Sequence, residues 1–397
     1  MWLRRGEGFV AVAGMPPVAY IRIPGGVAER ASRMAEAWQA LTSDAAIDDA
    51  VQVPGTGLIG FTALAFDDRS AVESILVVPA VIVGRRGGRS WITRIAREGQ
   101  PLPDAPSAPT TYGAQWSATL GPGALGPEGY EAAVRGGLDA IASGEVSKVV
   151  VARDLAGTVP VGADLRRLAR ALSTGYPDCW TFAVDGLIGA SPETLVTVSH
   201  GTVTARVLAG TASRGADADA DAAASAALAT SPKDQDEHAF AVQSVLRSLR
   251  PHMRSLAASE QPFTLRLPNV WHLATDVEGE LADAASGFDL IAQLHPTAAV
   301  AGTPTKVALD VIQRLEPFDR GRYAGPVGWI DAAGDGEWAI ALRCAQFSAE
   351  PVAGPSGEFD RLPVTAYAGA GIVAGSDPES ELIETRVKFR PIVDALA

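Results

Sequence analysis

Apolar positions along this chain follow a helical period in some segments and a strand period in others. Residues 127–143 carry apolar side chains every three or four positions and stop at Gly144, which predicts a helix. By the same signals, further helices are expected at 26–41, 231–256, 288–294, 304–315 and after Ser376. Within the predicted helix 231–256, the side chains expected to face inward are Phe240, Val245, Leu246 and Leu249.

Short apolar runs separated by polar turns predict strands between these helices. The predicted strands are 80–83, 91–95, 148–153, 180–184, 187–190, 194–198, 202–208, 324–330, 337–347 and 364–368. The alanine-rich stretch 212–230 is expected to form a mobile loop and a short surface helix. Because helices and antiparallel strands are interspersed without a regular β-α-β rhythm, the pattern favours the α+β class.

Composition narrows the range of partners. The chain has 397 residues, is 47% hydrophobic and carries a net charge of −13. Such an acidic chain without a basic run is a poor match for nucleic acid or an anionic membrane surface. No apolar run approaches the roughly 18 residues of a membrane span, and no convincing signal peptide is visible. We therefore expect a cytoplasmic protein, with Cys179 and Cys344 reduced in its core.

The clearest chemical signal lies near the C-terminus, where the glycine-rich segment 368–376 runs into a predicted helix. A capping box of Ser376 and Glu379 would begin that helix. Glu381, Glu384 and Lys388 then fall at i, i+3 and i+7 on one face. Glycine amides beside converging carboxylates can hold an anionic substrate through a hard divalent cation.

Two other interpretations compete for the same segment. Gly369, Gly371 and Gly375 resemble a relaxed dinucleotide-binding turn, which needs a second parallel strand and an acidic residue about 20 positions further on. The 22 residues after Gly375 form one predicted helix and cannot supply that unit. An ordinary turn followed by a solvated acidic helix stays open.

Charged residues in apolar segments are further candidates. Lys148 and Arg343 lie in predicted apolar strands, and Glu193 follows Pro192 where a strand is interrupted. A desolvated lysine can act as a base, a desolvated carboxyl as an acid, and an arginine can bind a carboxylate bidentately. Glu237, early in the predicted helix 231–256, is a candidate Mg²⁺ ligand together with Glu384. For each one, a solvated or structural role is the plain alternative.

Taken together, these motifs resemble the chorismate-utilising enzymes, and isochorismate synthases in particular. The resemblance is carried by residues 148–153, 190–195, 208–211, 233–238, 271–275, 294–302, 315–320, 323–329, 336–343, 369–373 and 381–385. It runs from about Gly121 to the C-terminus. Residues 1–115 are compatible with the variable N-terminal part of that fold, and 116–397 with its catalytic part.

The resemblance implies one large chorismate-binding domain, in which antiparallel sheets pack face to face and helices flank them. It also implies Mg²⁺-dependent conversion of chorismate to isochorismate. Lys148 would activate the water that attacks C2, and Glu193 would protonate the departing C4 hydroxyl. Mg²⁺ on Glu237 and Glu384, with Glu381 close by, would hold the ring carboxylate. The remaining substrate-binding positions would be Ala209, Gly210, Thr211, His272, His295, Tyr323, Arg343, Gly369, Gly371 and Lys388.

Single positions separate isochorismate synthases from related enzymes. Anthranilate-forming relatives typically lack a lysine matching Lys148, and aminodeoxychorismate synthases often have a lysine where this chain has Ala209. Salicylate synthases usually lack the His-Pro-Thr of 295–297. A salicylate synthase, which would also eliminate pyruvate, and a catalytically silent chorismate-binding protein stay open as alternatives. We expect a monomer.

Overall fold

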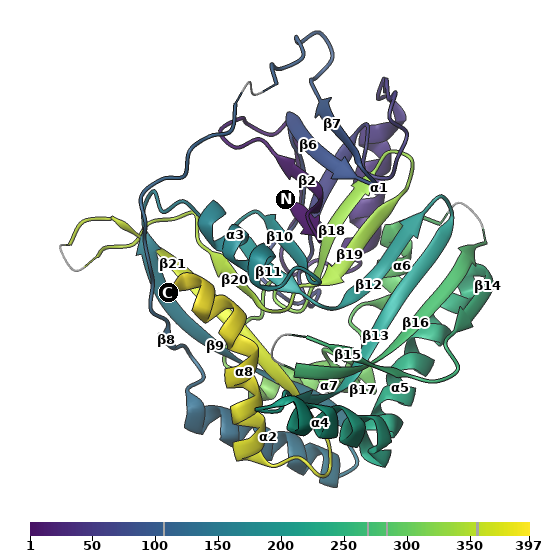
Figure 1. The fold of residues 1–397 in the computed structure, drawn as a ribbon, viewed down its shortest axis with the longest axis vertical. Coiled ribbons are helices and arrows are strands. Elements are labelled where there is room, and N and C mark those ends of the chain that lie inside the picture. Colours follow the sequence, from purple (N-terminus) through teal and green to yellow (C-terminus); the bar gives the residue numbers. More distant parts are fainter. Residues whose placement is uncertain (106–107, 268–269, 283–284, 355–356) are drawn as a thin grey trace.

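Two large antiparallel sheets form the body of the protein (Figure 1). The computed structural model describes residues 1–105, 108–267, 270–282, 285–354 and 357–397. The first sheet has the order β17 (Gly302–Thr303), β9 (Lys148–Pro160), β21 (Arg361–Ile372), β20 (Cys344–Phe347), β11 (Leu187–Ser191), β10 (Trp180–Val184), β1 (Trp2–Arg4), β2 (Glu7–Ala11), β6 (Val81–Arg86) and β7 (Arg89–Arg94), with β8 (Gly121–Pro122) beside β9.

The second sheet is built in the same antiparallel way. Its order is β14 (Met253–Ala258), β16 (Val270–Leu281), β13 (Thr202–Ser213), β12 (Thr194–Ser199), β19 (Gly336–Ile340), β18 (Pro326–Asp331), β4 (Ile59–Ala63), β5 (Ser74–Val78) and β3 (Ala19–Ile23), with β15 (Phe263–Arg266) beside β16. Strands from the first hundred residues therefore join both sheets.

Aromatic side chains fill the space between the two sheets. Phe9 of the first sheet meets Trp329 of the second edge-on, with ring centroids 5.0 Å apart, and lies 5.8 Å from Phe61. The indole N–H of Trp2 donates to the carboxylate of Glu337 at 2.9 Å, so the polar atom of this buried ring is satisfied. These contacts confirm the α+β class and the face-to-face sheets.

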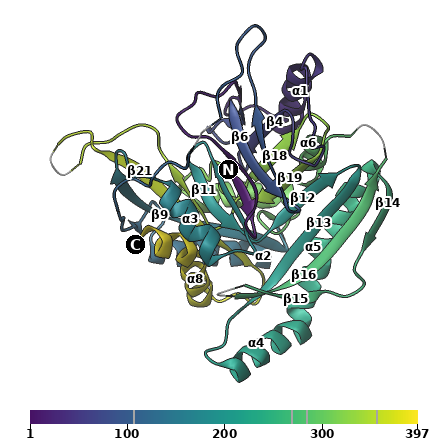
Figure 2. The same ribbon diagram turned by 45° about the horizontal axis from the view of Figure 1, so that its top comes forward.

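The helices divide between the two sheets (Figures 1 and 2). Those against the first sheet are α2 (Pro127–Ala142), α3 (Arg166–Gly175), α7 (Thr305–Leu315) and α8 (Pro378–Leu396). Those on the side of the second sheet are α1 (Arg30–Ser43), α4 (Ala218–Thr230), α5 (Pro232–Leu249) and α6 (Gly287–Leu294). Each sheet with its helices forms one half of the molecule, and the candidate site lies where the two halves meet.

The predicted helix 231–256 is corrected in two ways. It ends at Leu249, because the chain then turns through a short 3-10 segment containing Pro251 and enters β14. Phe240 does not face inward, since 61% of it is exposed, whereas Val245 and Leu249 are buried. The buried side chains of α5 recur from His238 at three- and four-residue steps, which leaves position 240 on the solvent side.

Two further predictions are corrected near the site. The expected strand 337–347 is broken into β19 and β20, and Arg343 lies between them with a left-handed backbone (φ 48°). Helix α8 is capped by Asp377, which accepts from the Ser380 N–H, rather than by the expected Ser376 capping box. Ser376 instead accepts from the Val373 N–H and closes the preceding turn.

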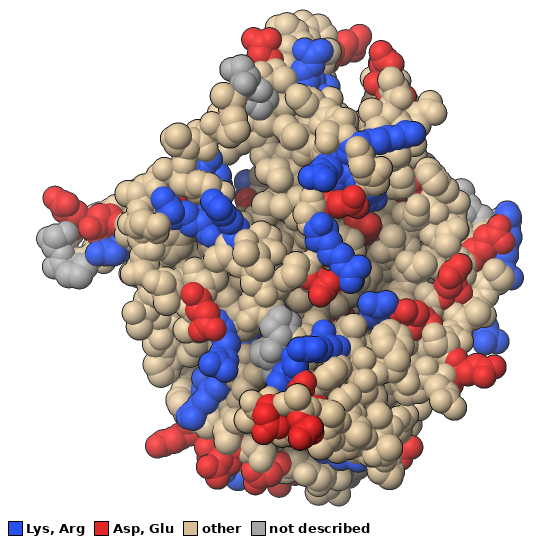
Figure 3. All heavy atoms as spheres, in the orientation of Figure 1, with Lys and Arg blue, Asp and Glu red and all other residues tan. Residues whose placement is uncertain are grey.

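The remaining predictions agree more closely with the structure. The stretch 212–230 forms the end of β13 and the regular helix α4, with residues 214–217 between them. Cys179 and Cys344 are buried free thiols, as expected. On the face shown in Figure 3, acidic and basic side chains are interspersed. Within the described ranges, no helix has the length and apolar character needed to cross a membrane.

Candidate active site

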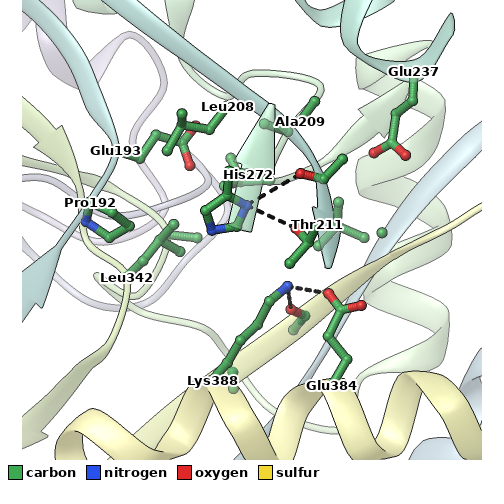
Figure 4. Close-up of a pocket in the computed structure, with 18 of the residues that line it drawn as sticks. Pro192, Glu193, Leu208, Ala209, Thr211, Glu237, His272, Leu342, Glu384 and Lys388 are labelled. Carbon is green, nitrogen blue, oxygen red and sulfur yellow. Dashed lines mark hydrogen bonds and ion pairs between the residues drawn. The ribbon is translucent and has the colours of Figure 1, made fainter. Parts of the chain in front are cut away.

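A polar cleft of about 160 Å³ lies between the two halves of the molecule (Figure 4). Its walls come from β9 and β21 of the first sheet, β13 and β16 of the second, and helices α5 and α8. The cleft brings together Lys148, Glu193, Ala209, Gly210, Thr211, Glu237, His272, Tyr323, Arg343, Gly369, Gly371, Glu381, Glu384 and Lys388. All of these were predicted from the sequence as site residues.

Helix α8 presents the predicted charged face to the cleft (Figure 4). The Nζ atom of Lys388 lies 2.6 Å from a carboxylate oxygen of Glu384 and donates to the carbonyl of Gly369 at 2.9 Å. The neighbouring Glu381 has a raised pKa, first because it is largely buried and second because Glu384 repels its negative charge. Helix α8 therefore places two carboxyl groups and one ammonium group at the cleft.

A second ion pair faces α8 across the cleft. Lys148, at the start of β9, lies 2.6 Å from a carboxylate oxygen of Glu237 on α5, and both side chains are mostly buried. A Cβ atom at Gly371 would come within 2.9 Å of the Lys148 side chain, so glycine leaves room for it there. The expected lysine is thus shielded from solvent, but a carboxylate compensates its charge.

Glu237, Glu381 and Glu384 are suitable donors for a hard cation such as Mg²⁺, which binds carboxylate oxygens. The raised pKa of Glu381 comes first from burial and second from repulsion by Glu384, and a bound cation would oppose both effects. As the side chains stand, no three His, Cys, Asp or Glu groups in the described parts of the chain converge closely enough to hold an ion. Two of the three carboxylates are instead paired with lysines.

Glu193 lies between β11 and β12, directly after Pro192. Its carbonyl accepts from the Ile340 N–H at 3.0 Å, which fixes the backbone. Burial raises the pKa of Glu193 to about 7, and the positive charges of Arg343, Lys148 and Lys388 oppose this rise. The side chain is therefore protonated in a large fraction of molecules near neutral pH, as a general acid requires.

Arg343 and His272 form the wall beside Glu193. The left-handed backbone at Arg343 breaks the strand between β19 and β20, where this side chain lines the cleft. An Arg343 Nη atom lies 3.5 Å from Nε2 of His272, whose Nδ1 is 2.9 Å from the Thr211 hydroxyl. Burial, then the charges of Arg343 and Lys388, lower the pKa of His272 to about 3. A neutral imidazole therefore stands here.

Gly210 has its predicted place because β13 is irregular at that point. Its register against β16 shifts between Ala209 and Thr211, and Gly210 adopts a positive φ of 79° that favours glycine. The buried His238 supports this bulge through the Ala209 carbonyl and the Thr275 hydroxyl. The irregularity turns the strand so that residues 209–211 line the cleft.

Sequence reasoning missed several lining residues, among them Tyr367 and Arg320. Tyr367 stacks on Tyr323 with ring centroids 5.1 Å apart. Strand alternation could have identified it, because Tyr367, Gly369 and Gly371 share one face of β21. Arg320 is held by a buried ion pair with Glu316 at 2.6 Å and by two backbone carbonyls. Lys233 and Asp234 also line the cleft.

His295 is the one predicted site residue that does not line the cleft. Its Nε2 atom lies 2.9 Å from the Phe66 carbonyl, and its ring meets the Phe66 ring edge-on. Burial lowers its pKa to about 4. This placement gives His295 a packing role at the end of α6 and does not support the predicted contact with substrate.

Comparison with known proteins identifies the family. Residues 2–397 match the family model for chorismate binding enzymes. The isochorismate synthase DhbC of Bacillus subtilis is 41% identical over 282 residues, which are 68% of each chain. Among solved structures, the putative 2,3-dihydroxybenzoate-specific isochorismate synthase DhbC from Bacillus anthracis superimposes with a TM-score of 0.76 at 30% identity, covering 100% of this chain and 95% of that one.

A second solved structure, the menaquinone-specific isochorismate synthase MenF from Escherichia coli, has a TM-score of 0.74 at 25% identity, covering 99% of this chain and 87% of that one. The family model spans both halves of the molecule that form the cleft. The chain therefore belongs to the chorismate-binding enzyme family.

Proposed function

We propose that this protein is an isochorismate synthase that converts chorismate to isochorismate in a Mg²⁺-dependent reaction. The observation that carries the proposal is the joint presence in one cleft of Lys148, of Glu193 with its raised pKa, of Arg343 and of three further carboxylates. Exchange of one hydroxyl for another across an allylic system needs a base for the attacking water and an acid for the leaving group. Proteins named isochorismate synthase are among the relatives reported above.

The proposed chemistry assigns one proton to each of two residues. Lys148 takes a proton from water as its oxygen forms a bond to C2, the ring double bonds shift, and the C4–oxygen bond breaks. Glu193 gives a proton to that oxygen, so one water enters and one water leaves. Lys148 must be neutral to accept this proton, so the Lys148–Glu237 ion pair must open and the Lys148 ammonium must release a proton to solvent before water attacks.

The same cleft offers groups for both carboxylates of chorismate. Arg343 can bind the enolpyruvyl carboxylate, with Tyr323 alongside, because a guanidinium matches the planar geometry of a carboxylate. Glu237, Glu381 and Glu384 would hold Mg²⁺, which neutralises the ring carboxylate when it is bound. Backbone amides of the glycine-rich segments around Gly210 and Gly371 complete the proposed contacts.

The proposal also concerns the division of the chain into parts and its oligomeric state. Residues 1–115 would be the variable part of the same fold and 116–397 the catalytic part. We propose that the protein acts as a cytoplasmic monomer. Light scattering coupled to size-exclusion chromatography measures that state directly.

Product analysis tests the proposed function. Purified protein with chorismate and Mg²⁺ should form isochorismate without salicylate or pyruvate, and excess chelator should stop turnover. Lys148→Gln and Glu193→Gln should each lower kcat by about 10²- to 10⁴-fold, and the double variant should be little worse, because both groups act in one step. Salicylate as the main product, or normal turnover by Lys148→Gln, would contradict the proposal.

A further inference from the structure

A second, smaller cavity lies on the other side of Glu193. It measures about 20 Å³, which is room for a single water molecule. Glu193 is part of the wall of both cavities, and Thr297 is part of the wall of the smaller one only. The other walls are mainly alanine, valine and leucine side chains from β12, β13 and α5. Glu193 therefore separates the substrate cleft from a small, largely apolar chamber.

One buried polar group on this chamber lacks a hydrogen-bond partner. The hydroxyl of Thr297 is buried and has no partner among the described residues. The Glu193 side chain is only partly buried, because it also borders the substrate cleft. The other polar side chains on the wall are already engaged: Arg206 binds Asp276 through two nitrogens, and Thr194 accepts from the Trp180 indole. Buried polar groups are normally satisfied by protein or by water, so the Thr297 hydroxyl is the group on this wall that requires an explanation.

We infer that the chamber holds one water molecule, positioned by the Thr297 hydroxyl, which returns a proton to Glu193 after each turnover. In a chamber of this size, a single water can reach both Thr297 and Glu193 on its wall. Such a water satisfies the Thr297 hydroxyl and the Glu193 carboxyl together. Thr297 is then a positioning residue that touches neither substrate nor metal.

The inference rests on the proposed function, in which Glu193 gives its proton to the departing C4 oxygen. Glu193 is left as a carboxylate while its face toward the cleft is covered by product. The chamber water donates a proton to this carboxylate and regains one from solvent, and Lys148 releases to solvent the proton it took from the attacking water. No proton is gained or lost over the cycle.

Charged groups around Glu193 set the background for any pH measurement. Arg343, Lys148 and Lys388 face it from the cleft, and Arg206 lines the chamber. None of these is altered by a change at Thr297. A shift in the pH profile of a Thr297 variant would therefore report on the chamber itself.

The test compares Thr297→Val, which keeps the shape and removes the hydroxyl, with Thr297→Ser, which keeps the hydroxyl. Thr297→Val should lower kcat by about tenfold, a part of the 10²- to 10⁴-fold that general acid catalysis supplies, with KM for chorismate unchanged. Its solvent deuterium isotope effect on kcat should rise, because proton return becomes slower. Thr297→Ser should behave as wild type, as should Thr202→Val, a control at an exposed position of β13.

A second variant fills the chamber from another part of its wall. Ala241→Val on α5 leaves Thr297 intact but takes the space of the water, so it should reproduce the effect of Thr297→Val. Normal kcat and isotope effect in both chamber variants would overturn the inference, as would equal loss in Thr297→Ser and Thr297→Val. Glu193→Gln distinguishes failure of the chamber water from failure of the proposed function. If Glu193→Gln is inactive while the chamber variants are normal, only the inference about the water fails. If Glu193→Gln turns over normally, the proposed acid fails as well.

Discussion

The raised pKa of Glu193 has a consequence for stability as well as for catalysis. Its pKa is about 7 in the folded protein, against about 4.5 for a free glutamate. Between these values the unfolded chain releases the proton while the folded protein keeps it, so this group lowers stability as pH rises from about 4.5 to 7. Below pH 4.5 both states are protonated and the penalty disappears.

We therefore predict that Glu193→Gln stabilises the folded protein at pH 8 while it removes activity. Glutamine keeps the size of the side chain but carries no charge that burial would penalise. Urea unfolding of wild type and variant at pH 8 and at pH 4.5 measures the effect, which should shrink at the lower pH. A gain of equal size at both pH values would show that charge burial is not its cause.

The two lysine–glutamate pairs predict competition between lysines and metal. Lys148 and Lys388 each lie 2.6 Å from a carboxylate proposed to bind Mg²⁺, so they act as tethered cations there. Replacing Lys388 by glutamine removes that competitor. The variant should bind Mg²⁺ about tenfold more tightly in the absence of substrate, because the interaction of a partly buried charge pair, a few kcal/mol, is large enough to cause such a change. Isothermal titration calorimetry measures this, with Lys306→Gln on α7 as the control. Unchanged or weaker binding would contradict the competition.

At the scale of single elements, α5 provides a matched pair of positions. Leu249 is fully buried and Phe240 is 61% exposed, although both are large apolar side chains on one helix. Leu249→Ala should lower the free energy of unfolding by about 2–5 kcal/mol, whereas Phe240→Ala should change it by less than about 0.5 kcal/mol. Urea denaturation of both variants decides the matter. A large loss in Phe240→Ala would mean that its side chain is covered in solution.

The same helix shows how far the sequence predicts the elements. Helix α2 and the hairpin of β10 and β11 agree with expectation to within one or two residues, because local spacing and turn residues determine them. The exposure of Phe240 on α5 and the break at Arg343 were not predicted. Both depend on how the segment packs against other elements, which the spacing of apolar residues along the chain does not determine.

The residues that line the cleft were predicted more completely than the residues that pack behind them. Motifs identified Lys148, Glu193 and the carboxylates, which the structure brings to one cleft, and their catalytic and metal-binding roles stay predictions. Tyr367 and Arg320 were missed because their contribution comes from packing against Tyr323 and from a buried pair with Glu316. His295 was placed in the site because its motif was recognised, and its contact with Phe66 appears only in three dimensions.

At the scale of the whole molecule, the N-terminal strands are part of both sheets. Strand β1 pairs with β10, and β4 pairs with β18, so removal of residues 1–115 would expose two strand edges and the aromatic core between them. We predict that the fragment 116–397 does not fold. Circular dichroism and urea unfolding of the fragment, beside the full chain, test this. A cooperative transition with retained activity would show an independent catalytic part.

The position of β21 has a consequence for how the protein is made on the ribosome. This strand begins at Arg361 and lies between β9 and β20, so the centre of the first sheet is incomplete until residues 361–372 have been translated. Helix α8, with Glu381, Glu384 and Lys388, emerges later still. Pairing over such long sequence separations makes folding slow, and a nascent chain has neither a closed sheet nor a site. The cleft can therefore assemble only after α8 has left the ribosome.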